Sequence, residues 1–344
     1  MTTENDPIHS RKATLKDVAK HANVSIATVS YVLNNSGSVG ASVRQKVLSS
    51  VGELNYKPNR SAQTMRTGRT KTIGLMLPDL RNPFFPELAQ SVEAAARENG
   101  YAVFLVDSQG SHETENISIQ KFIEYGVEGV IWCPASKNDT FANYRKSISS
   151  VVIDRPMADY DNVYSDYAEG GRLLAKEVLL KGHKRIGLIS GPKDIVSAQQ
   201  RREGFLQEID NKAEIAWESR VPFSVELDLN TTALLEMNNV STIVAGNDLI
   251  AIGALRILKA ANIAVPSSVS VTGFDGTPWS DIVSPSLTTI KQPLSKLGQE
   301  AVNLLLRRIE NPVADKENLI LGVHLLRRES LAAFVPTSER EITR

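Results

Sequence analysis

Planar hydrogen-bonding side chains follow four apolar runs of this chain, each at the point where the run ends. Carboxylate, guanidinium and amide groups make hydrogen bonds in fixed directions, and open α/β sheets bind ligands beyond the carboxyl ends of their parallel strands. A single polar residue at such a place is often a helix cap, which we expect for Asp248. Four such ends beside aromatic side chains favour a binding cleft. The residues are Asp79, Asn82, Phe84 and Phe85 after the first run, Asp154 and Arg155 after the second, Asn247 and Asp248 after the third, and Asp275 after the fourth.

The charges of this cleft favour a neutral ligand. Two carboxylates are balanced by two guanidinium groups, so an anion such as a phosphorylated sugar would lack the surplus of cations that it needs. Carboxylates accept hydrogen bonds from hydroxyls, and flat aromatic faces suit the C–H side of a sugar ring. The sequence therefore predicts a small, neutral, hydroxyl-rich ligand. The charged residues are Asp154, Asp275, Arg155 and Arg201, and the aromatic residues are Phe84, Phe85 and Phe223.

From residue 72 onward, short apolar runs alternate with helical patterns. Alternating β and α units predict parallel sheets covered by helices on both faces, and two such series predict two lobes. We therefore expect an α/β body of two doubly wound parallel-sheet lobes, with the cleft between them. The expected strands are 73–77, 102–107, 130–132 and 151–154 in the first series and 186–190, 242–245 and 269–273 in the second, with a helix over 86–99.

The chain begins with an all-α pattern. From Leu15 the apolar residues recur at i, i+3, i+4 and i+7, which predicts an amphipathic helix. After a tight turn Ser25 is a good N-cap for a second helix, and a third is expected over 41–54. In such a helix-turn-helix the second helix enters the major groove of DNA, where Ile26 and Ala27 would make apolar contact with thymine methyl groups. The outward positions are Ile26, Ala27, Ser30 and Tyr31, with the hydroxyl of Thr28 beside them.

Charge is distributed unevenly along the chain. Residues 11–69 contain ten basic and two acidic residues, a net charge of +8, while residues 1–10 carry −2. Because the whole chain has a net charge of zero, the remainder carries −6. A basic segment beside an acidic body is typical of nucleic-acid binding, since cations that displace counterions from phosphates supply much of the affinity.

A short segment, residues 59–67, links the two parts. It is compatible with a helix but holds too few apolar residues to fold alone, because isolated helices of this length are marginal in water. Two interpretations stay open, a plain linker or a helix that forms only on DNA. In the second case Met65 would wedge between base steps in the minor groove and Arg66 would lie along its floor.

Other classes of protein fit the sequence poorly. The five histidines show no His-x-x-x-His spacing and there is no Gly-x-Ser-x-Gly motif, so we expect no enzyme, no metal and no cofactor. A periplasmic transport protein would need an export signal, and residues 1–10 lack its apolar stretch. No apolar run is long enough to span a bilayer, and Cys133 is the only cysteine. We expect a protein of the bacterial cytoplasm, associated with the nucleoid.

Short motifs in the all-α segment, at 14–19, 24–25, 28–30, 32–34 and 55–59, resemble the headpiece of the LacI/GalR family of bacterial regulators. The resemblance implies a homodimer, a hinge helix ordered on DNA, an effector-binding core and a double-stranded, pseudo-palindromic operator. Two residues depart from common members, because Met65 stands where leucine is usual and Tyr31 where arginine or histidine is frequent. The DNA-binding residues that it implies are Leu15, Ser25, Ile26, Ala27, Thr28, Ser30, Tyr31, Asn34, Asn59, Ala62, Met65 and Arg66.

Motifs in the body, at 82–85, 154–155, 201–205, 247–248 and 273–278, resemble the binding residues of periplasmic ribose-binding proteins. This implies D-ribose or a close furanose or pyranose relative as the effector, as in regulators of ribose operons. Another pentose or hexose, a nucleoside or purine, or a protein corepressor stays open, although Ile195 stands where purine-responsive relatives have arginine. The effector residues so implied are Asn82, Phe84, Phe85, Asp154, Arg155, Ser197, Arg201, Phe223, Asn247, Asp275 and Gln292.

The same resemblance implies a mechanism and a division into domains. A sugar that bridges two lobes would favour a closed core, so we expect release of the operator on sugar binding, with corepression as the alternative. The tail lacks leucine heptads, which predicts a dimer rather than a tetramer built through a terminal bundle. The expected domains are a headpiece over 12–58, a hinge helix over 59–68, an N-terminal lobe over 70–166 and 293–322, and a C-terminal lobe over 167–292 and 323–338.

Overall fold

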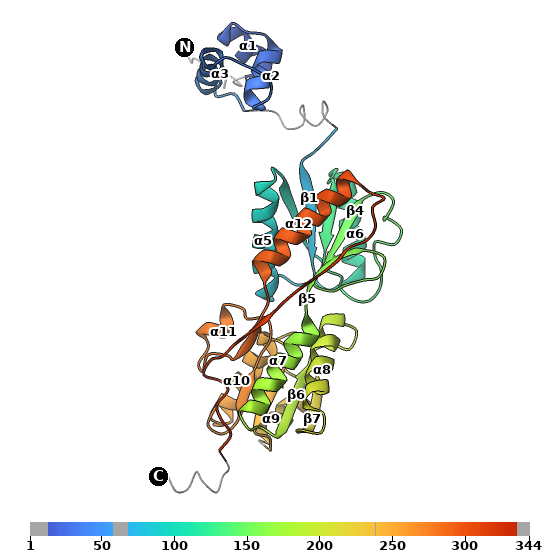
Figure 1. The fold of residues 1–344 in the computed structure, drawn as a ribbon, viewed down its shortest axis with the longest axis vertical. Helices are drawn as coiled ribbons and strands as arrows, with labels where there is room; N and C mark the ends of the chain where they lie inside the picture. Colours follow the sequence, from blue (N-terminus) through green and yellow to red (C-terminus); the bar gives the residue numbers. More distant parts are fainter. Residues whose placement is uncertain (1–12, 58–67, 238, 336–344) are drawn as a thin grey trace, which may run out of the picture. The chain divides into compact units, whose positions relative to one another are not determined.

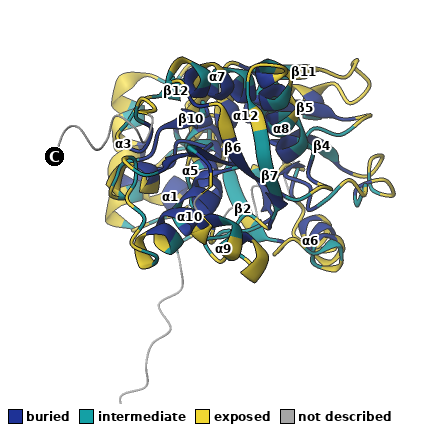
Figure 2. Cartoon of the chain, turned by 90° about the horizontal axis from the view of Figure 1, so that it is seen from below, coloured by how far each residue is buried: buried dark blue, intermediate teal, exposed yellow. Residues whose placement is uncertain are grey.

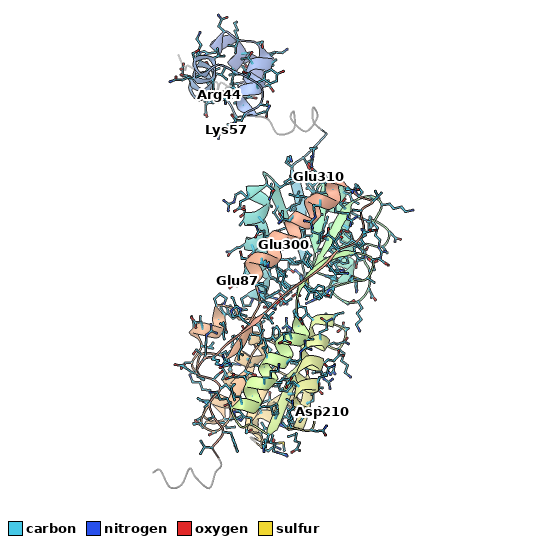
Figure 3. All side chains as sticks on the ribbon, in the orientation of Figure 1. Arg44, Lys57, Glu87, Asp210, Glu300 and Glu310 are labelled. Carbon is cyan, nitrogen blue, oxygen red and sulfur yellow. The ribbon has the colours of Figure 1, made fainter. Side chains whose placement is uncertain are left out.

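The computed structural model describes residues 13–57, 68–237 and 239–335, and the chain divides into two units after Thr70. Each unit has hydrophobic clusters of its own. The two units also differ in charge, as the uneven distribution of basic and acidic residues predicts. Figure 3 labels Arg44 and Lys57 on the smaller unit and Glu87, Asp210, Glu300 and Glu310 on the larger one.

The smaller unit contains three short helices. A capping box between Thr14 and Asp17 begins the first helix, and Asn23, with a left-handed φ of 51°, ends it and makes the tight turn before the second. The helices pack through apolar side chains such as Val18 and Val29, which are fully buried. The predicted helix-turn-helix is confirmed. Its helices are α1 (Leu15–Ala22), α2 (Ile26–Leu33) and α3 (Ala41–Glu53).

The first lobe of the larger unit is built on a six-stranded parallel sheet (Figure 1). In spatial order its strands are β11 (Asn318–Leu321), β5 (Asp161–Ser165), β4 (Ser149–Ile153), β3 (Gly129–Trp132), β1 (Thr72–Leu77) and β2 (Ala102–Asp107). Its helices are α5 (Phe84–Glu98), α6 (His112–Glu124) and α12 (Leu294–Glu310). Helices α5 and α12 pack on one face and α6 on the other. The central strands β4, β3 and β1 are mostly apolar and buried along most of their length, because both faces of the sheet are covered.

The second lobe is built on a smaller parallel sheet. Its strands in spatial order are β7 (Glu214–Arg220), β6 (Arg185–Ser190), β8 (Thr242–Ala245) and β9 (Ser270–Thr272), and an antiparallel pair, β10 (Thr289–Lys291) and β12 (His324–Leu326), lies beside β9. Its helices are α7 (Tyr167–Leu180), α8 (Val196–Ile209), α9 (Leu229–Glu236), α10 (Asp248–Ala260) and α11 (Trp279–Ile282). Helices α7 and α8 pack on one face of the sheet, and α9 and α10 on the other. The expected pair of doubly wound lobes is confirmed.

The chain passes between the two lobes at three places in the described segments. It crosses from β5 to α7, returns from β10 to α12, and crosses again from β11 to β12 (Figure 1). Strand β11 pairs with β5, so the edge of the first sheet and its covering helix α12 both come from the C-terminal part of the chain.

Burial follows this layered arrangement. The inner strands of both parallel sheets are largely buried, whereas the edge strands β2 and β7 are mostly half-buried and much of α9 is exposed (Figure 2). Some large apolar side chains stay at the surface, among them Leu105 on β2 and Ile282 on α11. Within the described segments we find no helix with both the length and the apolar character needed to cross a membrane.

The boundaries of several elements differ from expectation. Strand β4 ends at Ile153 and β9 at Thr272, each one residue early, and α5 begins at Phe84 rather than at residue 86. Strand β5 was not expected, because most of its residues are polar. It is nevertheless buried, since Arg308 donates from Nε to Oδ2 of Asp161 at 2.7 Å. Strands β7, β10, β11 and β12 were also not expected.

Candidate ligand site and nucleic-acid interface

Helix α2 presents the residues expected to meet DNA. Ser25 caps the helix, and its Oγ accepts a hydrogen bond from the backbone N–H of Thr28 at 3.0 Å. Ile26 and Tyr31 are 43% and 50% exposed, and Ala27 is exposed as well. This largely apolar surface at the start of the second helix suits contact with thymine methyl groups in a major groove.

Other residues expected at DNA are partly engaged within the headpiece or lie outside the described segments. Asn34 donates from Nδ2 to Oγ of Ser30 at 3.1 Å, and Leu15 is half-buried at the start of α1. The hinge helix therefore stays a prediction. Its residues Asn59, Ala62, Met65 and Arg66 lie outside the described residues.

The eleven residues expected to bind a ligand follow the carboxyl ends of strands in both sheets. Ten of them are buried, with exposed fractions of 9% or less, and Phe223 is half-buried. Buried polar groups cost free energy unless they have partners, so the hydrogen bonds among them decide what the site can still bind.

Arg201 stands at the centre of the contacts in the second lobe. Its Nη2 lies 3.0 Å from Oδ1 of Asp275, and its Nη1 donates to the carbonyl oxygen of Gly246 at 3.0 Å. Its guanidinium lies 4.0 Å from the ring centroid of Phe274 and 5.9 Å from that of Phe223. The structure thus brings Phe223 next to Arg201. Ser197 lies one helical turn before Arg201 on α8 and is buried.

Asp275 is held in a strained backbone conformation with a φ of 114°. Gln292 donates from Nε2 to its Oδ1 at 2.7 Å, so Gln292 and Arg201 both contact the same oxygen of the carboxylate. Burial raises the pKa of Asp275 to about 6; Arg201 opposes this rise and the charge of Asp154 adds to it.

Asp248 is not the helix cap that we expected. The side chain of Asn247 caps α10, since its Oδ1 accepts from the backbone N–H of Ile250 at 3.0 Å. The carboxylate of Asp248 instead accepts from the backbone N–H of Thr277 at 2.7 Å and from the hydroxyl of Thr289 at 2.6 Å. A buried carboxylate needs hydrogen-bond donors, and those of Asp248 come from the loop after β9 and from β10. Asp248 therefore holds this loop against β10. Burial and the neighbouring Asp275 raise the pKa of Asp248 to about 7.

Asp154 has partners that the sequence analysis missed. The hydroxyl of Tyr167 lies 2.6 Å from its Oδ1 and 2.7 Å from its backbone oxygen. Sγ of Cys133 lies 3.6 Å from its Oδ2, and Nε of Arg155 lies 3.7 Å from the same oxygen. Burial raises the pKa of the Tyr167 phenol well above its usual value, so the phenol stays a hydrogen-bond donor. No sequence pattern predicted a role for Tyr167, which is the first residue of helix α7.

Residues that follow β1 and β4 complete the part of the candidate ligand site that lies on the first lobe. The side chain of Asn82 accepts from the backbone N–H of Phe84 at 3.1 Å, and the rings of Phe84 and Phe85 meet edge to face at 5.1 Å. The guanidinium of Arg155 lies 5.8 Å from the Phe85 ring. Asp79 does not join this group, because its carboxylate binds Arg81.

Three buried atoms of the site have no hydrogen-bond partner: Nε of Arg155, Nε of Arg201 and Oε1 of Gln292. Two are donors and one is an acceptor, which matches the dual character of a hydroxyl group. A cavity of about 290 Å³ is lined by loops of the first lobe and by residues 194–196 of the second, and of the residues expected to bind a ligand only Arg155 lines it. The structure thus offers space for a small molecule between the lobes, beside Arg155.

Comparison with known proteins places the chain among bacterial regulators. The family model described as bacterial regulatory proteins of the lacI family matches residues 14–59, and a periplasmic binding protein-like domain matches 175–331. A ribose operon repressor of Halalkalibacterium halodurans is 35% identical over 92% of this chain and 96% of its own length. The chain belongs to the LacI family. A ribose operon repressor of Escherichia coli K12 is 30% identical over 92% of this chain and 99% of its own length.

Solved structures of LacI-family proteins match this chain over different lengths. The lac repressor dimer bound to operator and the anti-inducer ONPF has a TM-score of 0.81 and 27% identity, covering 94% of this chain and all of that one. A LacI-family regulator of Enterococcus faecium with bound ribose has a TM-score of 0.69 and 28% identity, covering 77% of this chain and all of that one.

Proposed function

We propose that this chain is a transcriptional repressor that binds a pseudo-palindromic operator as a homodimer and releases it when ribose, or a closely similar neutral sugar, binds the core. The observation that carries the sugar part is that three buried side-chain atoms, on Arg155, Arg201 and Gln292, have no hydrogen-bond partner among the described residues. Each of these atoms would gain a hydrogen bond with a sugar hydroxyl. A buried donor or acceptor without a hydrogen bond costs free energy, so the sugar would remove that cost.

The charge of the site supports a neutral ligand. Asp248 adds a third buried carboxylate to Asp154 and Asp275, against the two guanidinium groups of Arg155 and Arg201. The raised pKa of Asp248, about 7, reduces that excess of negative charge near neutral pH. No surplus of cations is left for a phosphate, whereas hydroxyls can donate to the carboxylates. The ribose bound by the Enterococcus faecium regulator and the names of the ribose operon repressors favour this sugar.

The operator part rests on α2 and on the basic charge of the first unit. The repressor function of the relatives and the operator bound by the lac repressor dimer support it. We infer that the lobes divide at the three crossings, into 70–166 with 293–322 and 167–292 with 323–338, and that the hinge helix covers 59–68. The pairing of β11 with β5 supports the assignment of residues 318–321 to the first lobe. The proposed location is the bacterial cytoplasm, and no catalytic role is proposed.

Sugar would act by changing the angle between the lobes. A ligand that contacts Asp154 and Arg155 on one lobe and Arg201 and Asp275 on the other favours a closed core. A sugar can change operator affinity only by as much as its own binding free energy differs between the open and the closed core. Such coupling free energies are commonly about 1 to 3 kcal/mol.

Two measurements on the full chain test the proposal. Selection from a random duplex library should enrich a pseudo-palindrome, and titration of the selected duplex with ribose should release the protein. Calorimetry with ribose, other pentoses and hexoses, purines and sugar phosphates identifies the ligand. Enrichment of no sequence would refute the operator part, and a selected duplex that stays bound with every neutral sugar at saturation would refute the sugar part.

A further inference from the structure

Lys71 begins the larger unit in an unusual backbone conformation. Its φ is 50°, in the left-handed region that residues with a Cβ rarely adopt. A residue other than glycine holds this conformation only where its surroundings fix it. The chain enters β1 at the next residue, so the contacts that hold Lys71 also hold the first residues of the larger unit.

Three groups hold Lys71. Its backbone N–H donates to Oε1 of Glu128 at 2.7 Å, and its carbonyl oxygen accepts from the backbone N–H of Ala102 at 2.9 Å. Its ammonium group lies 4.3 Å from the ring centroid of Tyr101, which is 6% exposed. These partners are far from Lys71 in sequence and are brought to it by the amino ends of neighbouring strands.

Glu128 contacts Lys71, Thr72 and Tyr101. Its Oε2 accepts from the hydroxyl of Tyr101 at 3.1 Å, and its backbone N–H donates to the carbonyl oxygen of Thr72 at 2.8 Å. The side chain of Glu128 thus binds the backbone of Lys71, and the backbone of Glu128 binds that of the next residue, Thr72. A carboxylate that accepts two hydrogen bonds is held in one orientation.

Glu128 also stands at the opposite end of β3 from the ligand site. Strand β3 begins at the residue after Glu128 and ends one residue before Cys133, whose Sγ lies 3.6 Å from Oδ2 of Asp154. Strand β1 runs parallel to it, with Gly74 opposite Val130. Five residues of extended chain span about 17 Å. Two paired strands therefore connect the ligand edge of the sheet to the contacts around Lys71.

We propose that Glu128 is a positioning residue that anchors the chain between core and headpiece, and that operator binding depends on this anchor. The inference rests on the proposed operator function. An anchored end has less conformational freedom, so less entropy is lost when the linking segment is ordered on DNA. Without the anchor, the free energy of ordering rises and the operator is bound more weakly.

The test measures the affinity of the full chain for the duplex selected by the wild type, without sugar. Glu128→Ala should weaken binding about tenfold, the size of a typical coupling between sites. Glu128→Gln keeps an oxygen for the Lys71 N–H and should restore affinity to within about twofold. The matched control is Glu124→Ala, which removes an exposed carboxylate at the end of α6 and should leave affinity unchanged. Ribose affinity should be the same in all four proteins.

The outcomes separate the anchor from the proposed function. A wild-type chain that selects no duplex refutes the operator function and the anchor with it. A wild-type chain that binds its duplex, with Glu128→Ala binding equally well, overturns the anchor alone. Should Glu128→Ala fail to fold, Tyr101→Phe decides, because it removes only the hydroxyl that orients Glu128. It should weaken operator binding measurably and leave ribose affinity intact, and unchanged operator binding would overturn the proposal.

Discussion

The hydroxyl of Tyr167 lies 2.6 Å from Oδ1 of Asp154 and connects the first helix of one lobe to a strand end of the other. The ring of Tyr167 in turn lies 5.0 Å from the guanidinium of Arg201. One buried phenol thus contacts an acidic residue of the first lobe and a basic residue of the second, both of them predicted to bind the ligand. It orients both groups before any ligand arrives.

Replacing Tyr167 by phenylalanine should weaken ribose binding about five- to tenfold. The change removes one hydrogen bond to a charged acceptor and leaves the ring in place, which costs about 1 to 1.5 kcal/mol. Calorimetry on the full chain measures the effect. Tyr164→Phe is the control, because that ring stacks on Tyr167 without a hydroxyl contact to Asp154. Equal ribose affinity in wild type and Tyr167→Phe would show that Asp154 needs no support from the phenol.

Replacing Arg201 by alanine should abolish the response of operator binding to sugar. It removes a forked donor and leaves the buried Asp275 without its cation, which costs about 3 to 5 kcal/mol where such a pair is broken. Ribose affinity should fall at least a hundredfold, measured by calorimetry. Arg172→Ala, which removes a half-exposed partner of Glu169, is the control. A sugar response of normal size in Arg201→Ala would remove Arg201 from the binding site.

Ribose binding should weaken as the pH falls. The pKa of Asp275 is raised to about 6 and that of Asp248 to about 7, so part of this pair is protonated near neutral pH. Sugar hydroxyls donate to an ionised carboxylate, hence binding favours the charged form and releases protons. Affinity should be highest above the raised pKa values and fall between about pH 7.5 and 5.5. Calorimetry in two buffers of different ionisation enthalpy would show proton release, and proton uptake would contradict the prediction.

Thymine methyl groups should contribute to operator affinity through Ile26. Replacing thymine by deoxyuridine in the selected half-site should weaken wild-type binding by about 1 kcal/mol, or roughly fivefold, per contacted methyl group. Ile26→Ala should bind the two duplexes with nearly the same affinity, because the exposed apolar side chain is gone. Competition binding with both duplexes measures this double change. If the replacement of thymine by deoxyuridine weakens binding of Ile26→Ala as much as binding of the wild type, Ile26 does not contact the methyl groups.

Strands buried on both faces could be predicted from the sequence, because they are continuous apolar runs. Strand β8 (Thr242–Ala245), which is fully buried, has the expected boundaries. So does β2 (Ala102–Asp107), an edge strand that is only partly buried but is also an apolar run. Strand β5 could not be predicted, since its burial depends on Arg308, a partner 147 residues away that neutralises Asp161. Three-residue strands such as β10 carry too little pattern to be distinguished from a loop.

The ligand site could be predicted as a set of strand ends but not as a network. Arg201 and Asp275 were expected from motif and position, and the structure places them 3.0 Å apart. Tyr167 and Asp248 act through partners distant in sequence, so no local spacing identifies them. Asp248 also looked like a helix cap because it follows a strand, and only the hydrogen bonds of Asn247 and Thr277 separate the two roles.

The order in which the lobes are completed follows from the pairing of β11 with β5. A ribosome releases the chain from its amino end, so the first sheet waits with an open edge at β5 until residues 318–321 emerge. By then all four strands of the second parallel sheet, the last of which ends at Thr272, have been synthesised. The sheet that begins first in the sequence is therefore completed after the second one, and the nascent protein exposes the bare edge of β5 while residues 166–317 are made.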